Sequence, residues 1–315
     1  KKGNLDFLKV GETINYKYSQ TQGSFGTGGI YWNGVHNMLI MSPLMHPYNS
    51  DGGYYLYADQ EKDNYKWDIS NGANKNPIAY LDYYMNQNLS KSHYMQSSFY
   101  AELQPIKNLR IKSQFGYIMG ASSYRSYLPR FDYLSASLNN AEDKVTQSMS
   151  MYNRWSWDNT ANYIFNIDDH NIDVLVGQSI EKWGMGEEMS GSAIGSNFYD
   201  FKHAYLSNVP LTANSVSSLT GKPKGEGSNA SFFGRVNYNY QEKYMASVIM
   251  RADGSSTFAR GHRWGYFPSV SAGWVISNES FMSGIKWLDF LKLRASWGQN
   301  GNCNVSTFQY LSLIT

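Results

Sequence analysis

Short runs in this chain switch between apolar and polar residues at every second position, and this alternation constrains the fold more than any other feature. In residues 232–240, apolar side chains such as Val236 alternate with polar ones such as Arg235. Residues 244–253 repeat the pattern after a three-residue connection. Because successive side chains on a strand point to opposite faces, the two runs predict an antiparallel β-hairpin.

The same alternation recurs along the chain and predicts about nine strands in total, each with one apolar and one polar face. A run of roughly ten residues is the length that a tilted strand needs to cross a bilayer. Besides the hairpin, we expect strands at residues 8–19, 99–104, 109–117, 151–167, 172–181 and 291–298. Glu12 falls on the apolar face of the first strand and is an exception.

The connections between these strands alternate between long and short. We expect short turns at 105–108, 168–171 and 241–243, an inner turn at 278–290 and an outer tip at 259–262. Irregular stretches are expected at about 20–93, 121–148 and 185–228. A soluble β-sandwich has no reason to place every long loop at one end. Transmembrane β-barrels do so, with short periplasmic turns and long extracellular loops. Asn76 and Pro77 predict a short capped helix through Tyr84 inside the first long stretch.

Composition fits a strand-rich membrane protein. Aromatic residues make up 16% of the chain and charged residues only 17%. No run of 18 apolar residues exists for a membrane helix, and a mean hydropathy of −0.50 is compatible with strands that expose alternate residues to lipid. We interpret Trp155 and Trp157 at one strand end, and Tyr163 and Phe165 at the other, as parts of two aromatic girdles. Core aromatic residues of a soluble β protein are the alternative.

Residues 233–244, 250–282 and 291–302 resemble the barrel of the SusC/RagA family, which are TonB-dependent outer-membrane transporters. Residues 7–19, 42–48 and 76–79 are similar more loosely. The motif residues that carry the resemblance are Arg251, Asp253, Gly254, Arg263, Trp264, Gly265, Pro268, Trp274, Trp297, Gly298, Gly301 and Asn302.

The resemblance implies an all-β fold, a partial transmembrane antiparallel barrel in which residues 1–315 belong to a larger barrel of about 22 strands. An odd number of strands does not close an ordinary single-chain barrel, and open sheet edges are costly in lipid. The N-terminus lacks the apolar stretch of a signal peptide. We therefore expect this chain to be an internal piece of a longer protein, without its plug and signal peptide.

By the same resemblance, the whole protein would import glycans, oligosaccharides or peptides across the outer membrane. The TonB complex would supply energy through the plug, and a SusD-like surface lipoprotein would capture the substrate above the long loops. A siderophore-type receptor is a variant of this interpretation. A structural or adhesive barrel without a transport cycle is the alternative, and an outer-membrane barrel enzyme is a third.

Residues that would carry catalysis or bind a metal or cofactor are not evident. The chain has no Gly-x-Ser-x-Gly motif, its single Cys303 has no obvious partner, and its histidines lack metal-ligand spacing. We expect no enzyme activity, no metal and no cofactor. The net charge of +2 is too small to indicate nucleic-acid binding.

Two sets of residues are candidates for substrate contact. Tyr31, Trp32 and Trp67 lie in the first long stretch, where aromatic faces can stack on a ligand, although a surface loop that packs on itself explains them equally simply. The second set is basic and faces the lumen, and it would bind an anionic substrate or, as we favour, pair with acids on the plug: Lys9, Lys17, Arg110, Lys112, Arg154, Arg235, Lys292 and Arg294. We interpret Arg251 and Asp253 as a structural pair rather than a cation or sugar site.

Overall fold

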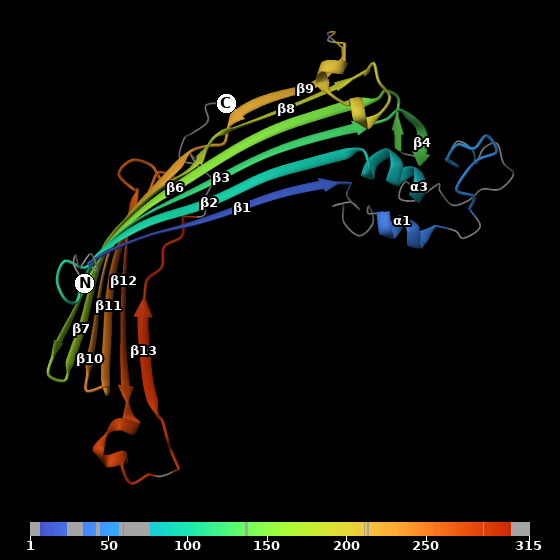
Figure 1. The fold of residues 1–315 in the computed structure, drawn as a ribbon. Coiled ribbons are helices and arrows are strands. Elements are labelled where there is room, and N and C mark those ends of the chain that lie inside the picture. The colour runs from blue at the N-terminus through green and yellow to red at the C-terminus, as the bar shows by residue number, and fades with distance from the viewer. Residues whose placement is uncertain are drawn as a thin grey trace, which may run out of the picture.

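The chain forms one long curved wall of antiparallel strands (Figure 1). A computed structural model describes residues 7–23, 34–41, 45–56, 59, 76–135, 138–210, 212, 214–285 and 287–303. Nine strands follow one another across the wall in sequence order, with β1 at one edge and β13 at the other. They are β1 (Leu8–Gln22), β2 (Asn88–Leu103), β3 (Leu109–Leu128), β6 (Lys144–Ile167), β7 (His170–Met185), β10 (Gly227–Tyr240), β11 (Tyr244–Ser255), β12 (Trp264–Val275) and β13 (Lys292–Gly298).

The nine strands along the wall confirm the predicted all-β fold, and they agree with the prediction of about nine strands across the sheet. Each pair is antiparallel and joins neighbours in the chain, as a meander of hairpins requires. The predicted hairpin pairs Val236 with Val248, and the next strand places Val270 beside Val248. Apolar residues therefore meet apolar residues across the wall on one face, because side chains opposite each other share a face.

Two further strands lie where the sequence predicts an irregular stretch from 185 to 228, so that prediction is wrong. β8 (Glu187–Ile194) and β9 (Val216–Pro223) continue the lines of β7 and β10. They pair with each other, and β8 also pairs with β6. The break before β8 lies at Gly186, whose φ is +132°. A Cβ there would lie 2.2 Å from the carbonyl oxygen of Met151, so only glycine fits this close approach.

The strands also extend further than the alternation predicts. β3 continues to Leu128 and β6 begins at Lys144, so most of the stretch predicted as irregular from 121 to 148 is strand. Between them lies a small two-stranded sheet, β4 (Phe131–Ser135) and β5 (Leu138–Asn140). The alternation is weak here because residues 120–126 are mostly small or polar on both faces.

Short turns gather at one end of the wall, which we call the turn end. The turns after β2, β6 and β10 place Asn108, Asp168, Gln241 and Glu242 at positive φ, as tight hairpins require. The fourth turn-end connection holds two short 3₁₀ helices, η4 (Ile276–Asn278) and η5 (Ser280–Met282). The predicted alternation of connection lengths is confirmed, and the long connections lie at the opposite end, the loop end (Figure 1).

The other helices among the described residues are short, and they lie at the loop end. They are α1 (Gly34–Ile40), α3 (Pro77–Tyr80) with its π-helical continuation η1 (Leu81–Met85), and the 3₁₀ helices η2 (Phe201–His203) and η3 (Leu206–Asn208). The side-chain oxygen of Asn76 accepts hydrogen bonds from the N–H groups of Ile78 and Ala79, which confirms the predicted cap. Within the described residues, every helix is too short to span a membrane.

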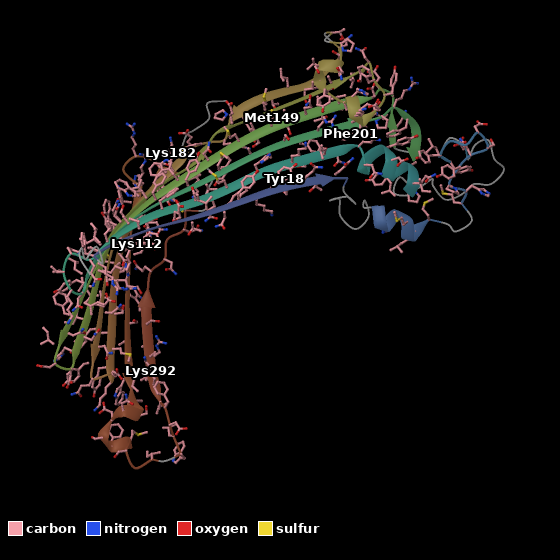
Figure 2. The ribbon with its side chains drawn as sticks, in the orientation of Figure 1. Tyr18, Lys112, Met149, Lys182, Phe201 and Lys292 are labelled. Atoms are coloured by element: carbon pink, nitrogen blue, oxygen red, sulfur yellow. The ribbon has the colours of Figure 1, made fainter. Side chains whose placement is uncertain are left out.

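The wall has two chemically different faces along most of its length. On the apolar face, large side chains stay exposed, including Val248 at 53%, Val270 at 44% and Trp297 at 57%. Ser247, Ser269 and Ser296, which precede or follow them in sequence, lie on the opposite, polar face, and side chains project from the wall along its whole length (Figure 2). A soluble monomer rarely exposes so large a continuous apolar surface.

The apolar face is covered only near the loop end. There, residues 196–210, which we call the cover segment, pack over the ends of β3, β6 and β8. Tyr127, Val145 and Ala193 of the wall form a buried cluster with Ala204 and Val209 of the cover segment. Arg125 fixes the segment further, since its Nη1 donates to the carbonyl of Phe201 at 2.8 Å and its guanidinium lies over the Phe201 and Tyr205 rings.

Candidate functional site

A network of charge-assisted hydrogen bonds crosses the polar face near the middle of the wall. Arg154 on β6 donates from Nη2 to Oε2 of Glu181 on β7 at 2.5 Å. The other oxygen of Glu181 accepts from Nδ2 of Asn229 on β10 at 2.9 Å. Each carboxylate oxygen therefore has its own donor, and an aqueous face can hold the ion pair at little cost.

Arg251 and Asp253 extend this network to β11. The Nε of Arg251 lies 2.8 Å from both carboxylate oxygens of Asp253, and its Nη2 donates to Oγ of Ser231 at 3.1 Å. The two residues lie two positions apart on one strand and therefore share the polar face. The predicted pairing of Arg251 with Asp253 is present in the structure, and its structural role stays our interpretation.

A hollow of about 560 Å³ lies on the polar face toward the loop end, and we call it the loop-end hollow. Residues of β7 and β10 meet there with β11, the connection into β12 that follows it, and the residues after β13. Its lining contains much of the predicted motif, namely Arg251, Asp253, Gly254, Arg263, Trp264, Gly265, Gly301 and Asn302. These eight motif residues are therefore brought together in one hollow, although they are separated in sequence.

The turn between β11 and β12 shows why several of these residues are needed. Gly254 pairs with Trp264 inside the ladder and therefore lies before the turn. A Cβ on Gly254 would lie 2.9 Å from the Trp264 ring, so the glycine makes room for the indole. The turn itself begins after Ser255, whose Oγ donates to Oγ1 of Thr257 at 3.0 Å. Arg263 closes it by donating from Nε to the carbonyl of Phe258 at 3.2 Å.

The remaining motif residues lie outside the loop-end hollow. Pro268 pairs with Met250, and Trp297 pairs with Val270, on the apolar face. Gly298 pairs with Ser269 on the polar face. Trp274 lies at the turn end and donates from Nε1 to Oε1 of Glu279 at 3.0 Å. The motif therefore does not form a single site.

Glu279, which the sequence alone does not single out, contacts three residues at the turn end. Its carboxylate also accepts from the Tyr244 hydroxyl at 2.6 Å and lies 3.5 Å from Nζ of Lys243. The hydrogen bond from Tyr244, with those from Trp274 and Lys243, lowers the pKa of the Glu279 carboxyl below its usual value. This carboxylate connects the turn before β11 with the turn after β12. The aromatic residues clustered near it in sequence are the signal by which it could have been found.

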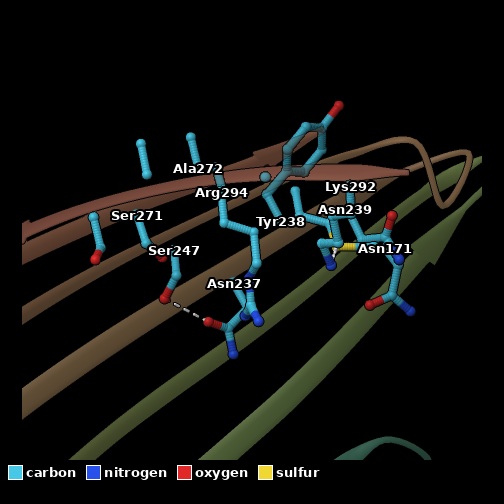
Figure 3. A pocket seen from close by; sticks show the side chains of 14 residues that line it. Asn171, Asn237, Tyr238, Asn239, Ser247, Ser271, Ala272, Lys292 and Arg294 are labelled. Atoms are coloured by element: carbon cyan, nitrogen blue, oxygen red, sulfur yellow. Dashed lines mark hydrogen bonds between the residues drawn. The ribbon is translucent and has the colours of Figure 1, made fainter. Parts of the chain in front are cut away.

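A second hollow, of about 400 Å³, lies on the polar face near the turn end (Figure 3). We call it the turn-end hollow. Its polar-face lining consists of amides and hydroxyls together with two cations, Lys292 and Arg294 of β13. Ser247 donates to Oδ1 of Asn237 at 2.7 Å across its floor. Its described lining contains no carboxylate.

The predicted basic set divides into two groups. Lys9 lies 3.7 Å from Glu102, Arg154 binds Glu181, and Arg235 lies 3.8 Å from Asp173. These three cations therefore already have acid partners in the wall, so the expectation that the set waits as a whole for plug acids is wrong for them. Lys112 instead lies 4.8 Å above the Tyr100 ring. Among the described residues, Lys17, Arg110, Lys292 and Arg294 form no ion pair.

The aromatic residues predicted to contact a ligand, Tyr31, Trp32 and Trp67, lie outside the described residues. Cys303 is an exposed free thiol at the rim of the loop-end hollow. In the part of the chain that the structure describes, His, Cys, Asp and Glu form no cluster able to hold a metal ion.

A curved antiparallel wall with an exposed apolar face, a polar inner face and all short turns at one end is the wall of a transmembrane β-barrel. No family model matches the chain. The chain is 30% identical over 315 residues to the TonB-dependent receptor P26 of Formosa agariphila, covering 98% of this chain and 29% of that protein. It is also 45% identical over 84 residues to the TonB-dependent receptor SusC of Bacteroides thetaiotaomicron, which is 26% of this chain and 8% of SusC.

A solved structure has the same fold. The RagAB peptide importer in its open-open state superposes with a TM-score of 0.77 at 25% identity, over 98% of this chain and 32% of that chain. The chain is a SusC/RagA-like TonB-dependent transporter segment. It spans about three tenths of the curated relatives that it matches along its whole length.

Proposed function

We propose that this segment is part of the barrel domain of an outer-membrane protein that imports nutrients, either glycans and oligosaccharides or peptides, with energy from the TonB complex. Support comes from relatives that are TonB-dependent receptors and from a neighbour that is a peptide importer. Transport and receptor functions in these relatives also favour a protein that is not an enzyme.

The observation that carries the proposal is the uncovered apolar face. Large apolar residues on β1, β7, β10, β11, β12 and β13 remain exposed although each of these strands is hydrogen-bonded to its neighbours in the wall. Water would make such a surface unfavourable by roughly 25 cal/mol for each Å². Lipid removes that cost, which supports a wall that lies in the outer membrane with its polar face toward the lumen.

The loop end is the place for a surface partner. We propose that a SusD-like lipoprotein rests there, since the long connections and the small helices project from this end of the wall (Figure 1). The SusC relative and the RagAB importer support a partnership of this kind. The short turns at the opposite end would then face the periplasm, where the TonB complex acts.

The alternative is a structural or adhesive barrel without a transport cycle. It shares the apolar face and differs only in what passes through the lumen. The two polar-face hollows favour the importer, because a barrel that only holds its shape has no need for solvent-accessible hollows lined by charged and amide groups.

Purification of the full-length protein from detergent-solubilised outer membranes tests the proposal. We expect the protein in the outer-membrane fraction, with a stoichiometric lipoprotein identified by mass spectrometry, and loss of nutrient uptake when TonB is absent. A solitary barrel, with uptake unchanged without TonB, would support the structural alternative. Recovery in the soluble fraction would exclude both.

A further inference from the structure

The turn-end hollow holds two cations that form no ion pair among the described residues. Lys292 and Arg294 lie two positions apart on β13 and reach the same hollow from one edge (Figure 3). Asn237 and Asn239 on β10, together with Ser247 on β11, line the rest of its polar surface. Each of these side chains is neutral, so the hollow carries an uncompensated positive charge.

Nearby carboxylates are already occupied. Asp173 accepts a hydrogen bond from Asn162 and lies 3.8 Å from Nη2 of Arg235. Glu279 is surrounded by its three donors at the turn end. Nζ of Lys292 instead lies 2.8 Å from the sulfur of Met245, a weak acceptor that does not balance an ammonium group.

An acceptor in the same place also lacks a donor. Oδ1 of Asn239 is buried and forms no hydrogen bond among the described residues. A buried amide oxygen without a donor costs about 1–3 kcal/mol, so such atoms usually have a partner. The hollow therefore presents two cations for an anion and one acceptor for an N–H or O–H group.

The other cations of the polar face show that the feature is specific. Lys9, Arg154 and Arg235 each have an acid on a neighbouring strand of the wall. Lys17 and Arg110 form no ion pair among the described residues, but neither lines the turn-end hollow. The turn-end hollow brings together two cations without an ion pair, Lys292 and Arg294, and a buried acceptor without a hydrogen bond, Oδ1 of Asn239.

We infer that the turn-end hollow binds a carboxylate between Lys292 and Arg294, on a molecule that also donates an N–H or O–H group to Asn239. Arg294 offers a planar guanidinium that can donate two parallel hydrogen bonds to a carboxylate, and Lys292 adds a point charge. The inference uses the polar face as the inside of a barrel, and to that extent it rests on the proposed function. The carboxylate belongs either to an acidic side chain of the same polypeptide or to an acidic ligand in the lumen.

Zero-length cross-linking of the purified full-length protein in detergent tests this inference. A carbodiimide activates a carboxylate, which forms an amide with a lysine Nζ in contact with it and releases the urea. Lys9 with Glu102 and Lys182 with Glu226 provide internal controls, because these groups lie 3.7 Å and 2.6 Å apart. Lys292 forms no ion pair among the described residues, so a Lys292 amide to any carboxylate other than the nearby Asp173 and Glu279 reports a carboxylate from elsewhere.

We expect peptide mapping to find a Lys292 amide. A bond to an Asp or Glu of the same polypeptide other than Asp173 and Glu279 would identify an internal acidic segment as the source. A bond that forms only with added N-acetyl-triglutamate, and that saturates with its concentration, would identify a lumen ligand. Recovery of both control amides without any such Lys292 amide in either arm would overturn the inference.

Variants distinguish a carboxylate bound in the turn-end hollow from nonspecific cross-linking of Lys292. Arg294→Gln removes the bidentate donor and should lower the yield of the Lys292 amide about tenfold, whereas Arg294→Lys should keep part of it. Lys17→Gln, on the polar face but away from the hollow, should leave that yield unchanged. An unchanged yield in Arg294→Gln would also overturn the inference. Membrane fractionation reads the proposed function separately, since cross-linking of purified protein does not depend on where the cell places it.

Discussion

The apolar face of the wall has two regions with opposite surroundings. Near the loop end, Val145 is fully buried because the cover segment lies over it. Further toward the turn end, Val248 and Val270 lie on the same face and stay about half exposed. The chain thus buries this face with its own residues where the face meets water, and leaves it bare where another apolar medium is available. We expect the membrane to end near the edge of the cover segment.

The largest expected effect comes from a charge in the bare region. Val270→Arg should destabilise the full-length protein in lipid vesicles by about 2–4 kcal/mol, because the guanidinium would face hydrocarbon. Urea unfolding followed by tryptophan fluorescence measures the change. Ser269→Arg is the matched control, since this neighbouring residue faces the polar side and should cost about 0–1 kcal/mol. Equal losses in both variants would contradict the assignment of the faces.

A cavity in the covered region should destabilise the cover segment nearly as much as Val270→Arg destabilises the whole protein, but only locally. Val145→Ala removes two methyl groups from a buried cluster and should weaken the cover segment by about 2–3 kcal/mol. Hydrogen exchange of residues 196–210 in the full-length protein reports it. Val270→Ala changes the same side chain in the bare region, where lipid fills the space, and should leave exchange of the cover segment unchanged.

Loss of the Arg125 contacts should have a smaller effect on the same segment. Arg125→Gln removes hydrogen bonds to the carbonyls of Phe201 and Lys202 and the contacts with two rings. We expect a loss of about 1–2 kcal/mol, read as faster proteolysis within the cover segment. Arg125→Lys should retain some protection through its charge. Unchanged proteolysis in Arg125→Gln would show that the buried cluster alone holds the segment.

The smallest expected effects concern pH, and they have opposite signs in the two regions. Burial raises the pKa of Asp143, which accepts from the N–H of Ser196 at the start of the cover segment. Its ionised form therefore opposes folding above the raised pKa, and acid relieves that cost. The lowered pKa of Glu279 has the reverse consequence: its support is present at neutral pH and is lost as the pH falls through that pKa.

Acidification should therefore loosen the turn at Glu279 while the start of the cover segment keeps its protection. Trp274 fluorescence, which senses its hydrogen bond to Glu279, measures the first response, and proteolysis at the cover segment measures the second. Glu279→Gln should remove the fluorescence change, and Asp143→Asn should flatten the proteolysis profile. A fluorescence change that persists in Glu279→Gln would exclude this carboxylate as its source.

Most of the wall is predictable from sequence because one face meets an apolar medium and the other meets water, which requires apolar and polar residues to alternate strictly. Residues 232–240 and 244–253 identify their hairpin for that reason. The alternation fades beyond the membrane, so β8 and β9, which carry polar residues on both faces, are not predictable in this way. The motif residues were also visible, but not their convergence, since the loop-end hollow depends on register between strands. Glu181 and Asn229 became significant only through the contacts that β7 and β10 bring together.

The register of the wall has a consequence for how the protein assembles. A slip of one residue between β10 and β11 would exchange the faces of a whole strand, turning Arg251 outward and Val248 inward. In water such an error costs some packing, but in a bilayer it places a guanidinium in hydrocarbon. The membrane therefore selects for the correct strand register during assembly, because misaligned strands are unfavourable in lipid. The tight turns need only to initiate each strand pairing.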